Sequence, residues 1–383
     1  MIATKKVISV LFFAVLFLPA FAAAQITAPT PISDTAKRVD TTKKTVFTLR
    51  TVGMAPVYLF EMNDNAKIDA AHQFPGARPL PDSCYYHGER HLKNIRQLTF
   101  EGVNTRPAIS PDDRYLAFQS HGIKPNSCDQ IYRMPLTGVP AGRISSGQGR
   151  ATGAEFLSDD EILFSSTQAV NGGSCPKEKK TFEKGSDLYI ADTDGKNIRR
   201  LTSDSAHFSG GASVSANGKL IIFTNTRTGS AELFSMRRDG DGSTQRTYDD
   251  ASHVDASYSP NGNDIVFCES NPNNPAEAGI YVMTAEGRDV RQVTHLGGTN
   301  CNPCWVPDGE HVVFSSNYLD PSGKAFDLFM IKRDGTGLER LTYGGGFNGF
   351  PVFTRDGNQL VFCSSRNATH PGDVNMFAAD WAQ

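Results

Sequence analysis

The sequence lacks the patterns that mark several common classes of protein. It has no G-x-S-x-G motif, which argues against the nucleophile elbow of an α/β-hydrolase domain. It also has no concentrated basic patch, because the lysines between Lys177 and Lys184 are interrupted by Glu178 and Glu183, and the formal net charge is -3. Nucleic-acid binding needs a basic footprint, so it is not expected here.

Long hydrophobic runs are missing as well. The apolar run Val7–Leu18 is only about 12 residues long, too short to span a bilayer. It follows Lys5 and Lys6 and precedes a small-residue site at Ala22–Ala24, the order found in an export signal. We therefore expect residues 1–24 to be a signal peptide, with no membrane span after its cleavage. No cysteine follows the site, so a lipid anchor is not expected.

What the sequence has in abundance is one repeat, written six times between Ile95 and Trp381. Each copy has a Ser-Pro-Asp-Gly-like turn, an apolar strand pattern, a Leu-Tyr-x-Met-like segment and a closing Arg-x-Leu-Thr. The turns recur at intervals of roughly 44 to 58 residues, which is the period of a four-stranded propeller blade. They begin at Ser110, Leu157, Ser215, Ser259, Val306 and Thr354. The repeat predicts an all-β, six-bladed β-propeller over residues 95–383.

The repeats begin out of phase, which predicts how the ring closes. Arg96–Thr99 is a closing element, whereas Asn375–Ala378 is a third element with no fourth after it. We expect residues 95–100 to supply the outer strand of the last blade, because closure by both ends of the chain hides the edge strands. Trimming the chain up to Asn94 should then be tolerated.

The segment before the repeats, residues 25–94, is rich in Thr, Pro and Ser near its start. This composition is typical of a flexible lead, followed here by coil. Short strands are possible at Thr45–Leu49 and Pro56–Glu61.

Seven cysteines in an exported chain leave at least one thiol unpaired. Cys128 and Cys175 fall in the loops between second and third strands of neighbouring blades, so they are the predicted disulfide. Cys268 and Cys363 occupy equivalent positions after a Val-Phe pair, which favours buried thiols. The sequence leaves open the pairing of five residues: Cys84, Cys268, Cys301, Cys304 and Cys363.

The repeats resemble the propeller repeat of TolB and its relatives. The resemblance is clearest in Ser259–Gly262, followed by Ile265–Phe267, Gly279–Met283 and Arg291–Thr294. It implies a periplasmic or secreted bacterial propeller that binds peptides or other proteins around the mouth of its central channel. TolB also carries an α/β domain ahead of its propeller, and residues 25–94 show no alternation of strands and helices, so a role in a Tol system stays open.

Segments that enter the innermost strands should line the channel mouth. Their side chains are small or polar with both signs of charge, which suits recognition of a chain terminus or loop. In the alternative interpretation they only solvate a water-filled channel. The predicted contact residues are Asn104, Arg106, Arg150, His253, Asp255, Asn300 and Asn348.

A metal site is a weaker prediction. His207, His253 and His295 fall in successive blades, on the face where related oligogalacturonate lyases place metal-binding histidines. Metal binding needs three or four converging ligands. The sequence shows no matching pattern of carboxylates, so we expect no metal or other cofactor, and no catalytic residues are assigned.

Together these features favour an exported, monomeric module that binds an envelope protein or peptide in the periplasm or outside the cell. Whether it is an enzyme stays open, with a non-enzymatic role favoured. One alternative is a metal-dependent polysaccharide lyase or another hydrolytic enzyme on the same propeller. The other is a scaffold that holds its partners at the blade edges.

Overall fold

The computed structural model describes residues 50–51, 56–57, 78–81, 84–121, 128–138, 141–176, 180–271 and 273–382. The expected signal peptide and most of the lead lie outside the described residues. The chain divides into two compact units, of which the smaller is Leu16–Gln73. In that unit β1 (Arg50–Thr51) pairs antiparallel with β2 (Pro56–Val57).

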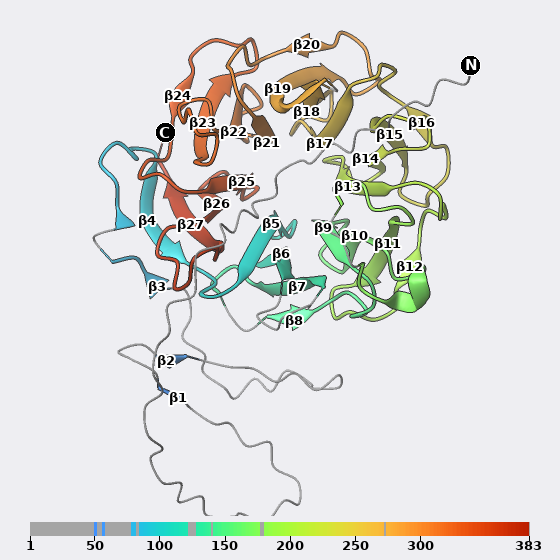
Figure 1. The fold of residues 1–383 in the computed structure, drawn as a ribbon, viewed down its shortest axis with the longest axis horizontal. Helices are drawn as coiled ribbons and strands as arrows, with labels where there is room; N and C mark the ends of the chain where they lie inside the picture. Colours follow the sequence, from blue (N-terminus) through green and yellow to red (C-terminus); the bar gives the residue numbers. More distant parts are fainter. Residues whose placement is uncertain are drawn as a thin grey trace, which may run out of the picture. The chain divides into compact units, whose positions relative to one another are not determined.

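The larger unit contains six antiparallel sheets arranged around a central axis, which confirms the predicted propeller (Figure 1). Blade 1 is β5 (Val103–Ile109), β6 (Tyr115–His121), β7 (Asp129–Pro135) and β8 (Gly142–Arg143). Blade 2 is β9 (Ala151–Phe156), β10 (Glu161–Ser166), β11 (Asp187–Asp192) and β12 (Arg199–Arg200). Blade 3 is β13 (Ser209–Val214), β14 (Leu220–Asn225), β15 (Glu232–Arg237) and β16 (Thr244–Gln245).

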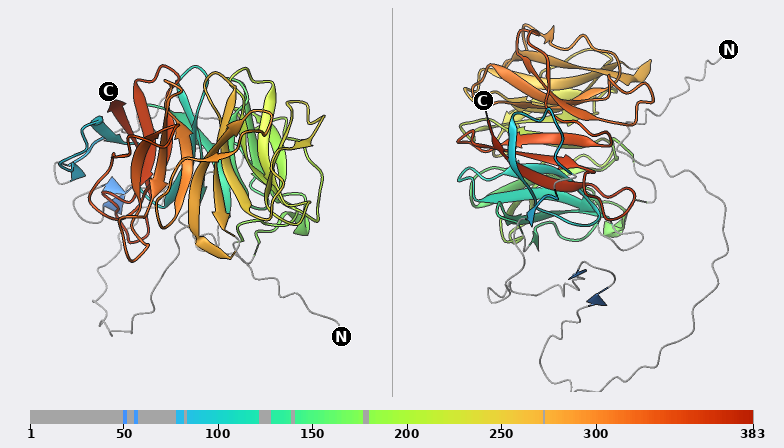
Figure 2. Two further views of the ribbon diagram at one scale, coloured as in Figure 1. Left: turned by 90° about the horizontal axis from the view of Figure 1, so that it is seen from above. Right: turned by 90° about the vertical axis from the view of Figure 1, so that its left-hand side faces the viewer.

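The remaining blades follow the same order. Blade 4 is β17 (Ser252–Tyr258), β18 (Asp264–Asn271), β19 (Asn274–Thr284) and β20 (Arg291–Gln292). Blade 5 is β21 (Asn300–Trp305), β22 (His311–Ser316), β23 (Asp327–Lys332) and β24 (Glu339–Arg340). Blade 6 is β25 (Asn348–Phe353), β26 (Gln359–Ser364), β27 (Asn375–Trp381), β4 (Leu92–Gln97) and β3 (Arg78–Pro79). In each blade the first of the sequential strands lies nearest the axis, and from the side the strands run along that axis (Figure 2).

The ring closes as predicted, through a strand that precedes the repeats. β4 pairs antiparallel with β27, although it begins at Leu92 rather than Ile95. β3 adds a fifth strand outside β4, which the repeat pattern did not predict. Leu80 and Leu92 are buried in the core of blade 6. Because these residues pack on blade 6, we now expect that trimming to Asn94 destabilises the propeller, in place of the tolerance expected from the repeats.

Each blade is held together by one pair of aromatic rings that face each other across its second and third strands. Their ring centroids lie 5.8 to 6.1 Å apart. The six pairs are Phe118–Tyr132, Phe164–Tyr189, Phe223–Phe234, Phe267–Tyr281, Phe314–Phe329 and Phe362–Phe377. Cross-strand aromatic pairs are a main source of sheet stability. They explain why the apolar strand patterns of the repeat always include an aromatic residue.

The closing threonine of the repeat has a structural role at the outer strand. In blade 5 the Thr342 hydroxyl accepts a hydrogen bond from the Leu328 amide (2.8 Å) and donates one to the Asp327 carboxylate (3.1 Å). The same amide-to-hydroxyl bond occurs in all six blades, with Ser145 in place of threonine in blade 1. Because the third strand is buried, this hydroxyl satisfies polar groups that would otherwise be desolvated without a partner.

Candidate functional site

Every innermost strand is interrupted near its middle by a shift in its pairing register with the second strand. One residue at each shift has left-handed backbone geometry, with φ between 51° and 58°. These six residues, which we call the bulge ring, are Arg106, Gly153, Gly211, Asp255, Asn302 and Phe350. A bulge re-aims the side chain it carries. For the four that are not glycine the conformation costs about 1 to 3 kcal/mol each, a strain found most often at functional sites.

The bulge ring is bridged across the channel by an ion pair. The Arg106 Nη1 atom donates to Asp255 Oδ1 at 2.9 Å. Arg106 lies in blade 1 and Asp255 in blade 4, which are opposite one another in a ring of six. The Asn302 amide donates to the other Asp255 oxygen at 2.8 Å, and the Arg106 guanidinium lies 5.0 Å from the centre of the Phe350 ring. Four of the six ring positions therefore form one connected polar and aromatic cluster.

The other two positions of the bulge ring are bare backbone. A β-carbon added to Gly153 would meet nothing closer than the Gly211 backbone, at 3.9 Å. One added to Gly211 would meet only the Thr224 hydroxyl, also at 3.9 Å. Glycine allows a ligand to approach the backbone closely. The ring is thus asymmetric, with charge, amide and aromatic groups on one side and open backbone on the other.

Glu155 of β9 and Cys304 of β21 each lie two positions after a member of the bulge ring, and they come from opposite blades. Burial raises the pKa of the Glu155 carboxyl to about 8, and the charge of Arg355 only partly counteracts this. Burial also raises the pKa of the Cys304 thiol to about 12, with a further contribution from Glu155. In both residues burial therefore favours the protonated, uncharged form.

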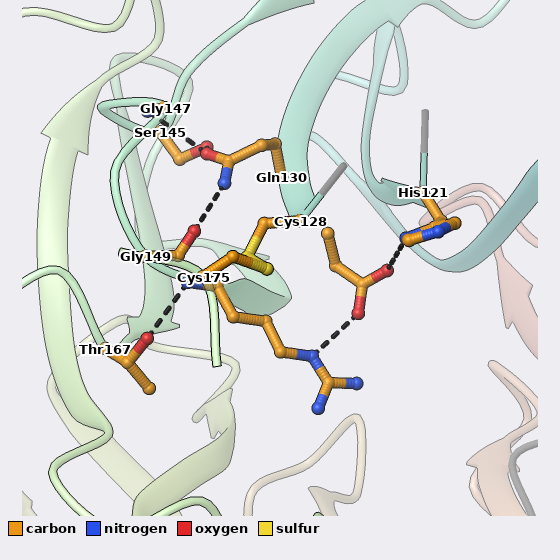
Figure 3. The surroundings of a disulfide bond; sticks show 10 residues. His121, Cys128, Gln130, Ser145, Gly147, Gly149, Thr167 and Cys175 are labelled. Carbon is orange, nitrogen blue, oxygen red and sulfur yellow. Dashed lines mark hydrogen bonds and ion pairs between the residues drawn. A yellow bond between two sulfur atoms is a disulfide. The ribbon is translucent and has the colours of Figure 1, made fainter. Parts of the chain in front are cut away.

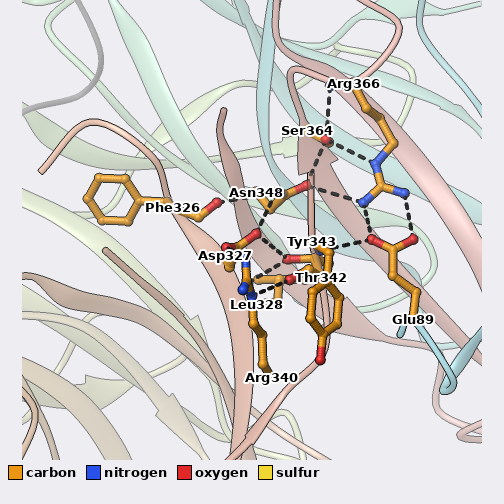
Figure 4. Close-up of polar contacts among 10 residues, drawn as sticks. All are labelled: Glu89, Phe326, Asp327, Leu328, Arg340, Thr342, Tyr343, Asn348, Ser364 and Arg366. Atoms are coloured by element: carbon orange, nitrogen blue, oxygen red, sulfur yellow. Dashed lines mark hydrogen bonds and ion pairs between the residues drawn. The ribbon is translucent and has the colours of Figure 1, made fainter. Parts of the chain in front are cut away.

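The predicted contact residues divide into two groups, and only Arg106 and Asp255 belong to the bulge ring. Asn104, Asn300 and Asn348 are at most 5% exposed and join neighbouring blades. In Figure 4 the Asn348 amide donates to the Asp327 carboxylate (3.1 Å) and accepts from Ser364 (2.8 Å). Each of the three lies at the first or second position of an innermost strand and donates its amide to the preceding blade of the ring, so we assign these asparagines to blade joining.

Arg150 also lies at a junction between blades. Its Nε atom donates to the Asp129 carboxylate at 2.7 Å, and Asp129 also contacts the His121 ring at 3.0 Å. Beside them a disulfide joins Cys128 of blade 1 to Cys175 of blade 2, the pair expected from their loop positions (Figure 3). The other five cysteines are free, and Cys268 and Cys363 are fully buried, as expected.

The three histidines do not converge on one point. His207 pairs with Asp204 at 2.7 Å, and His295 is exposed. His253 is 1% exposed and lies 3.2 to 3.5 Å from the carboxylates of Glu232, Asp249 and Glu269. Burial alone would lower the His253 pKa, but the neighbouring carboxylates of Glu232, Glu269 and Asp249 outweigh it and raise the pKa to about 9.

The carboxylates around His253 correct the sequence analysis, which found no acidic pattern to match the histidines. They come from two blades and the segment between them. Their convergence depends on the packing of blade 3 against blade 4, and no spacing in the sequence indicates it.

A surface pocket of about 630 Å³ lies away from the channel, between the segment before β4 and the outer strand of blade 5. It is lined by Tyr86, His87, Gly88, Glu89, Arg90, Lys93, Glu339, Arg340 and Tyr343. Beside it the carboxylate of Glu89 forms two hydrogen bonds with the guanidinium of Arg366, at 2.8 and 3.1 Å (Figure 4). This ion pair fixes the segment before β4 to blade 6.

The closed ring of blades and the bridged channel define the class of the protein: a six-bladed β-propeller with a polar central site. Residues 272–380 match the model of the TolB beta propeller domain. The chain thus carries a TolB-like propeller, which confirms the resemblance seen in its repeats.

Relatives support the same assignment. The chain is 32% identical over 138 residues to the Tol-Pal system protein TolB of Helicobacter hepaticus, covering 35% of this chain and 32% of that protein. It is 24% identical over 212 residues to an uncharacterized protein of Agrobacterium fabrum, covering 55% of this chain and 64% of the relative. The chain therefore spans less than two thirds of the length of either curated relative.

A solved structure shares the fold. The crystal structure of TolB from Acinetobacter baumannii superposes with a TM-score of 0.50 at 18% identity, covering 64% of this chain and 56% of that one. Within the described part of the chain, no helix has the length and apolar character needed to cross a membrane.

Proposed function

We propose that the protein is an exported binding module of the cell envelope that recognises a segment of a peptide or protein in its propeller channel. The observation that carries this proposal is the bulge ring, in which a cross-channel ion pair faces bare glycine backbone. The export signal expected in residues 1–24 and the similarity to TolB support a periplasmic or secreted location. We expect the module to act as a monomer.

The chemistry of the bulge ring suits an extended chain segment. The Arg106 side chain is 39% exposed, so a ligand carboxylate can form a charge-assisted hydrogen bond with it. Asp255 and Asn302 offer an acceptor and an amide for ligand N–H and C=O groups. Gly153 and Gly211 leave room for the backbone of the segment, and Phe350 supplies an apolar surface. A few polar groups around an accessible concave site are the usual features of a binding site.

The strained backbone of the ring supports a functional role. A glycine at any of the four other positions would remove the strain, as it does at Gly153 and Gly211. Arg106, Asp255, Asn302 and Phe350 instead place functional side chains at a conformational cost. The case is strongest for Arg106 and Phe350, because arginine and phenylalanine seldom adopt this conformation.

The proposal is tested by capture from envelope extract with residues 25–383 as bait. The test variant exchanges the two charges, Arg106→Glu with Asp255→Lys, which keeps an ion pair across the channel but reverses its direction. The matched control reverses an ion pair in the turn of the first repeat, Arg114→Glu with Asp112→Lys, whose charged atoms lie 2.5 Å apart.

We expect the native chain and the control to capture the same partner and the channel variant to lose it. Capture by all three proteins would contradict recognition in the channel and would favour the blade edges. Capture of no partner by the native chain would contradict the binding-module proposal itself.

A further inference from the structure

The acidic residues that begin the third strands follow a rule of charge balance. The third strand begins with an acidic residue in blades 1, 2, 3 and 5, and in three of these blades an arginine forms an ion pair with that residue. Asp129 pairs with Arg150, Asp187 with Arg200 and Asp327 with Arg340. Blade 3 breaks the rule. Its third strand begins with Glu232, but the residue equivalent to Arg200 and Arg340 is Gln245, whose amide instead donates to the Thr247 carbonyl at 2.6 Å.

The junction of blade 3 with blade 4 carries two more carboxylates besides Glu232. Glu269 lies opposite His253 in the strand pairing, at a position that is serine in blades 1, 5 and 6. Asp249 comes from the segment that connects blades 3 and 4. Three carboxylates thus surround one imidazole, and no arginine or lysine of the described residues forms an ion pair with any of them. Even a protonated His253 would leave two negative charges unbalanced, and the Glu232 carboxylate among them is buried, with 2% of its side chain exposed.

The central histidine is not satisfied by its neighbours. The His253 Nδ1 atom is buried and has no hydrogen-bond partner among the described residues, although Glu232 Oε2 lies 3.2 Å away. The residue is 1% exposed. A buried ring nitrogen without a partner is rare and needs an explanation. It points to a group that belongs at this junction in addition to the protein atoms.

We propose that Glu232, Asp249 and His253 bind a divalent transition-metal ion, with Zn²⁺ as the best match. Each of the three offers one ligand atom, and these atoms lie within 4.8 Å of one another. Glu269, at 3.4 Å from Nε2 of His253, is the fourth candidate ligand. Ligands held about 2.1 Å from a tetrahedral ion lie about 3.4 Å apart. Asp249 and Glu269 lie 3.5 and 3.4 Å from Nε2 of His253, whereas Glu232 lies 3.2 Å from Nδ1.

The chemistry of the donors favours Zn²⁺ or Mn²⁺ over Ca²⁺. An imidazole nitrogen suits first-row transition metals, whereas Ca²⁺ and Mg²⁺ take oxygen ligands. When one ring nitrogen binds the ion, the other can donate its hydrogen to a neighbouring carboxylate, an arrangement that is common in zinc sites. The ion has a route of entry, since the side chains of Asp249 and Glu269 are 63% and 22% exposed. It would join blades 3 and 4, as the Asp129–Arg150 ion pair joins blades 1 and 2.

The test uses the full chain, freed of metal with a chelator and then titrated separately with Zn²⁺, Mn²⁺ and Ca²⁺. Calorimetry gives the stoichiometry and affinity, and the melting temperature gives an independent measure of binding to the folded state. His253→Asn places at this junction the residue found at positions 104, 300 and 348. Asp249→Asn changes an exposed side chain and should not disturb folding. His207→Asn is the control, because His207 also pairs with an aspartate.

We expect one Zn²⁺ per native chain, a rise in melting temperature, and little binding of Ca²⁺. Asp249→Asn should weaken Zn²⁺ binding by at least about tenfold and His253→Asn should abolish it, whereas His207→Asn should leave it unchanged. The proposal is overturned if the folded native chain binds no Zn²⁺ or Mn²⁺ in excess metal. It is equally overturned if Asp249→Asn binds as tightly as the native chain, which would place the ion elsewhere, for example at the free cysteines.

Discussion

The Arg106–Asp255 pair should contribute measurably to the stability of the ring as well as to binding. At 2.9 Å the Coulombic attraction is about 6 kcal/mol for an effective dielectric constant of about 20. Partial removal of both charges from water offsets most of this gain. Arg106 keeps part of its hydration at 39% exposure, whereas Asp255 is 13% exposed. We expect a net coupling energy of about 1 to 2 kcal/mol, above the value for an exposed pair.

A double-mutant cycle measures this coupling through the free energies of unfolding of the native chain, Arg106→Met, Asp255→Asn and the double variant. Urea unfolding can be followed by the fluorescence of Trp305 and Trp381 and by circular dichroism, whose transitions should coincide if unfolding is two-state. The control cycle uses Lys196 and Asp194, which are 2.7 Å apart but 76% and 54% exposed.

The control pair should couple by less than about 0.5 kcal/mol and lose that coupling in high salt, whereas the channel pair should keep most of its own. A channel coupling no larger than the control would refute the view that the ion pair spans a partly desolvated site.

Three further predictions concern other parts of the ring. The Glu155 pKa is raised from 4.5 to about 8, so the folded state keeps a proton that the unfolded chain has lost. Stability should therefore fall as pH rises between these values, on the order of 1 kcal/mol per pH unit, and Glu155→Gln should flatten that slope in urea unfolding at several pH values. Glu89→Ala should lower the free energy of unfolding by about 3 to 5 kcal/mol, because it leaves the buried Arg366 charge unpaired. A Glu89→Ala chain as stable as the native chain would contradict this. Replacing Cys128 and Cys175 by serine should lower the melting temperature by an amount that corresponds to about 2 to 4 kcal/mol, since the bond closes a loop of 47 residues; an unchanged melting temperature would contradict this estimate.

The fold could be predicted because the repeat records both the turns and the strands. The turn and the period-two apolar strands recur six times, the turn contains Asp-Gly or Asn-Gly in four copies, and a threonine or serine closes every blade. The shifted phase of the repeats indicates ring closure. The segment from Arg78 to Leu92 has no counterpart in the other blades. Its buried Leu80 and Leu92 are isolated apolar residues in the sequence, so no pattern indicated that they pack on blade 6.

The functional site was only partly predictable. The bulge ring has no shared residue type, so comparison of the repeats gives no signal for it; the common feature is a backbone angle. Asp255, Asn302 and the two glycines are residue types that tolerate this angle, but Arg106 and Phe350 are not. The burial of individual polar side chains could not be predicted from the sequence either. The polar character of Asn300 and Asn348 suggested a channel mouth, whereas the structure places them between blades.

The central claim, that a partner enters the channel, is tested most directly by placing a photo-crosslinker there. Phe350 can be replaced by p-benzoylphenylalanine, an aromatic substitution within the bulge ring. The same group at Val290, which is 50% exposed beside the outer strand of blade 4, probes the blade edge. We predict that irradiation in envelope extract joins a partner to position 350 and not to position 290. Crosslinking at position 290 alone would contradict recognition in the channel.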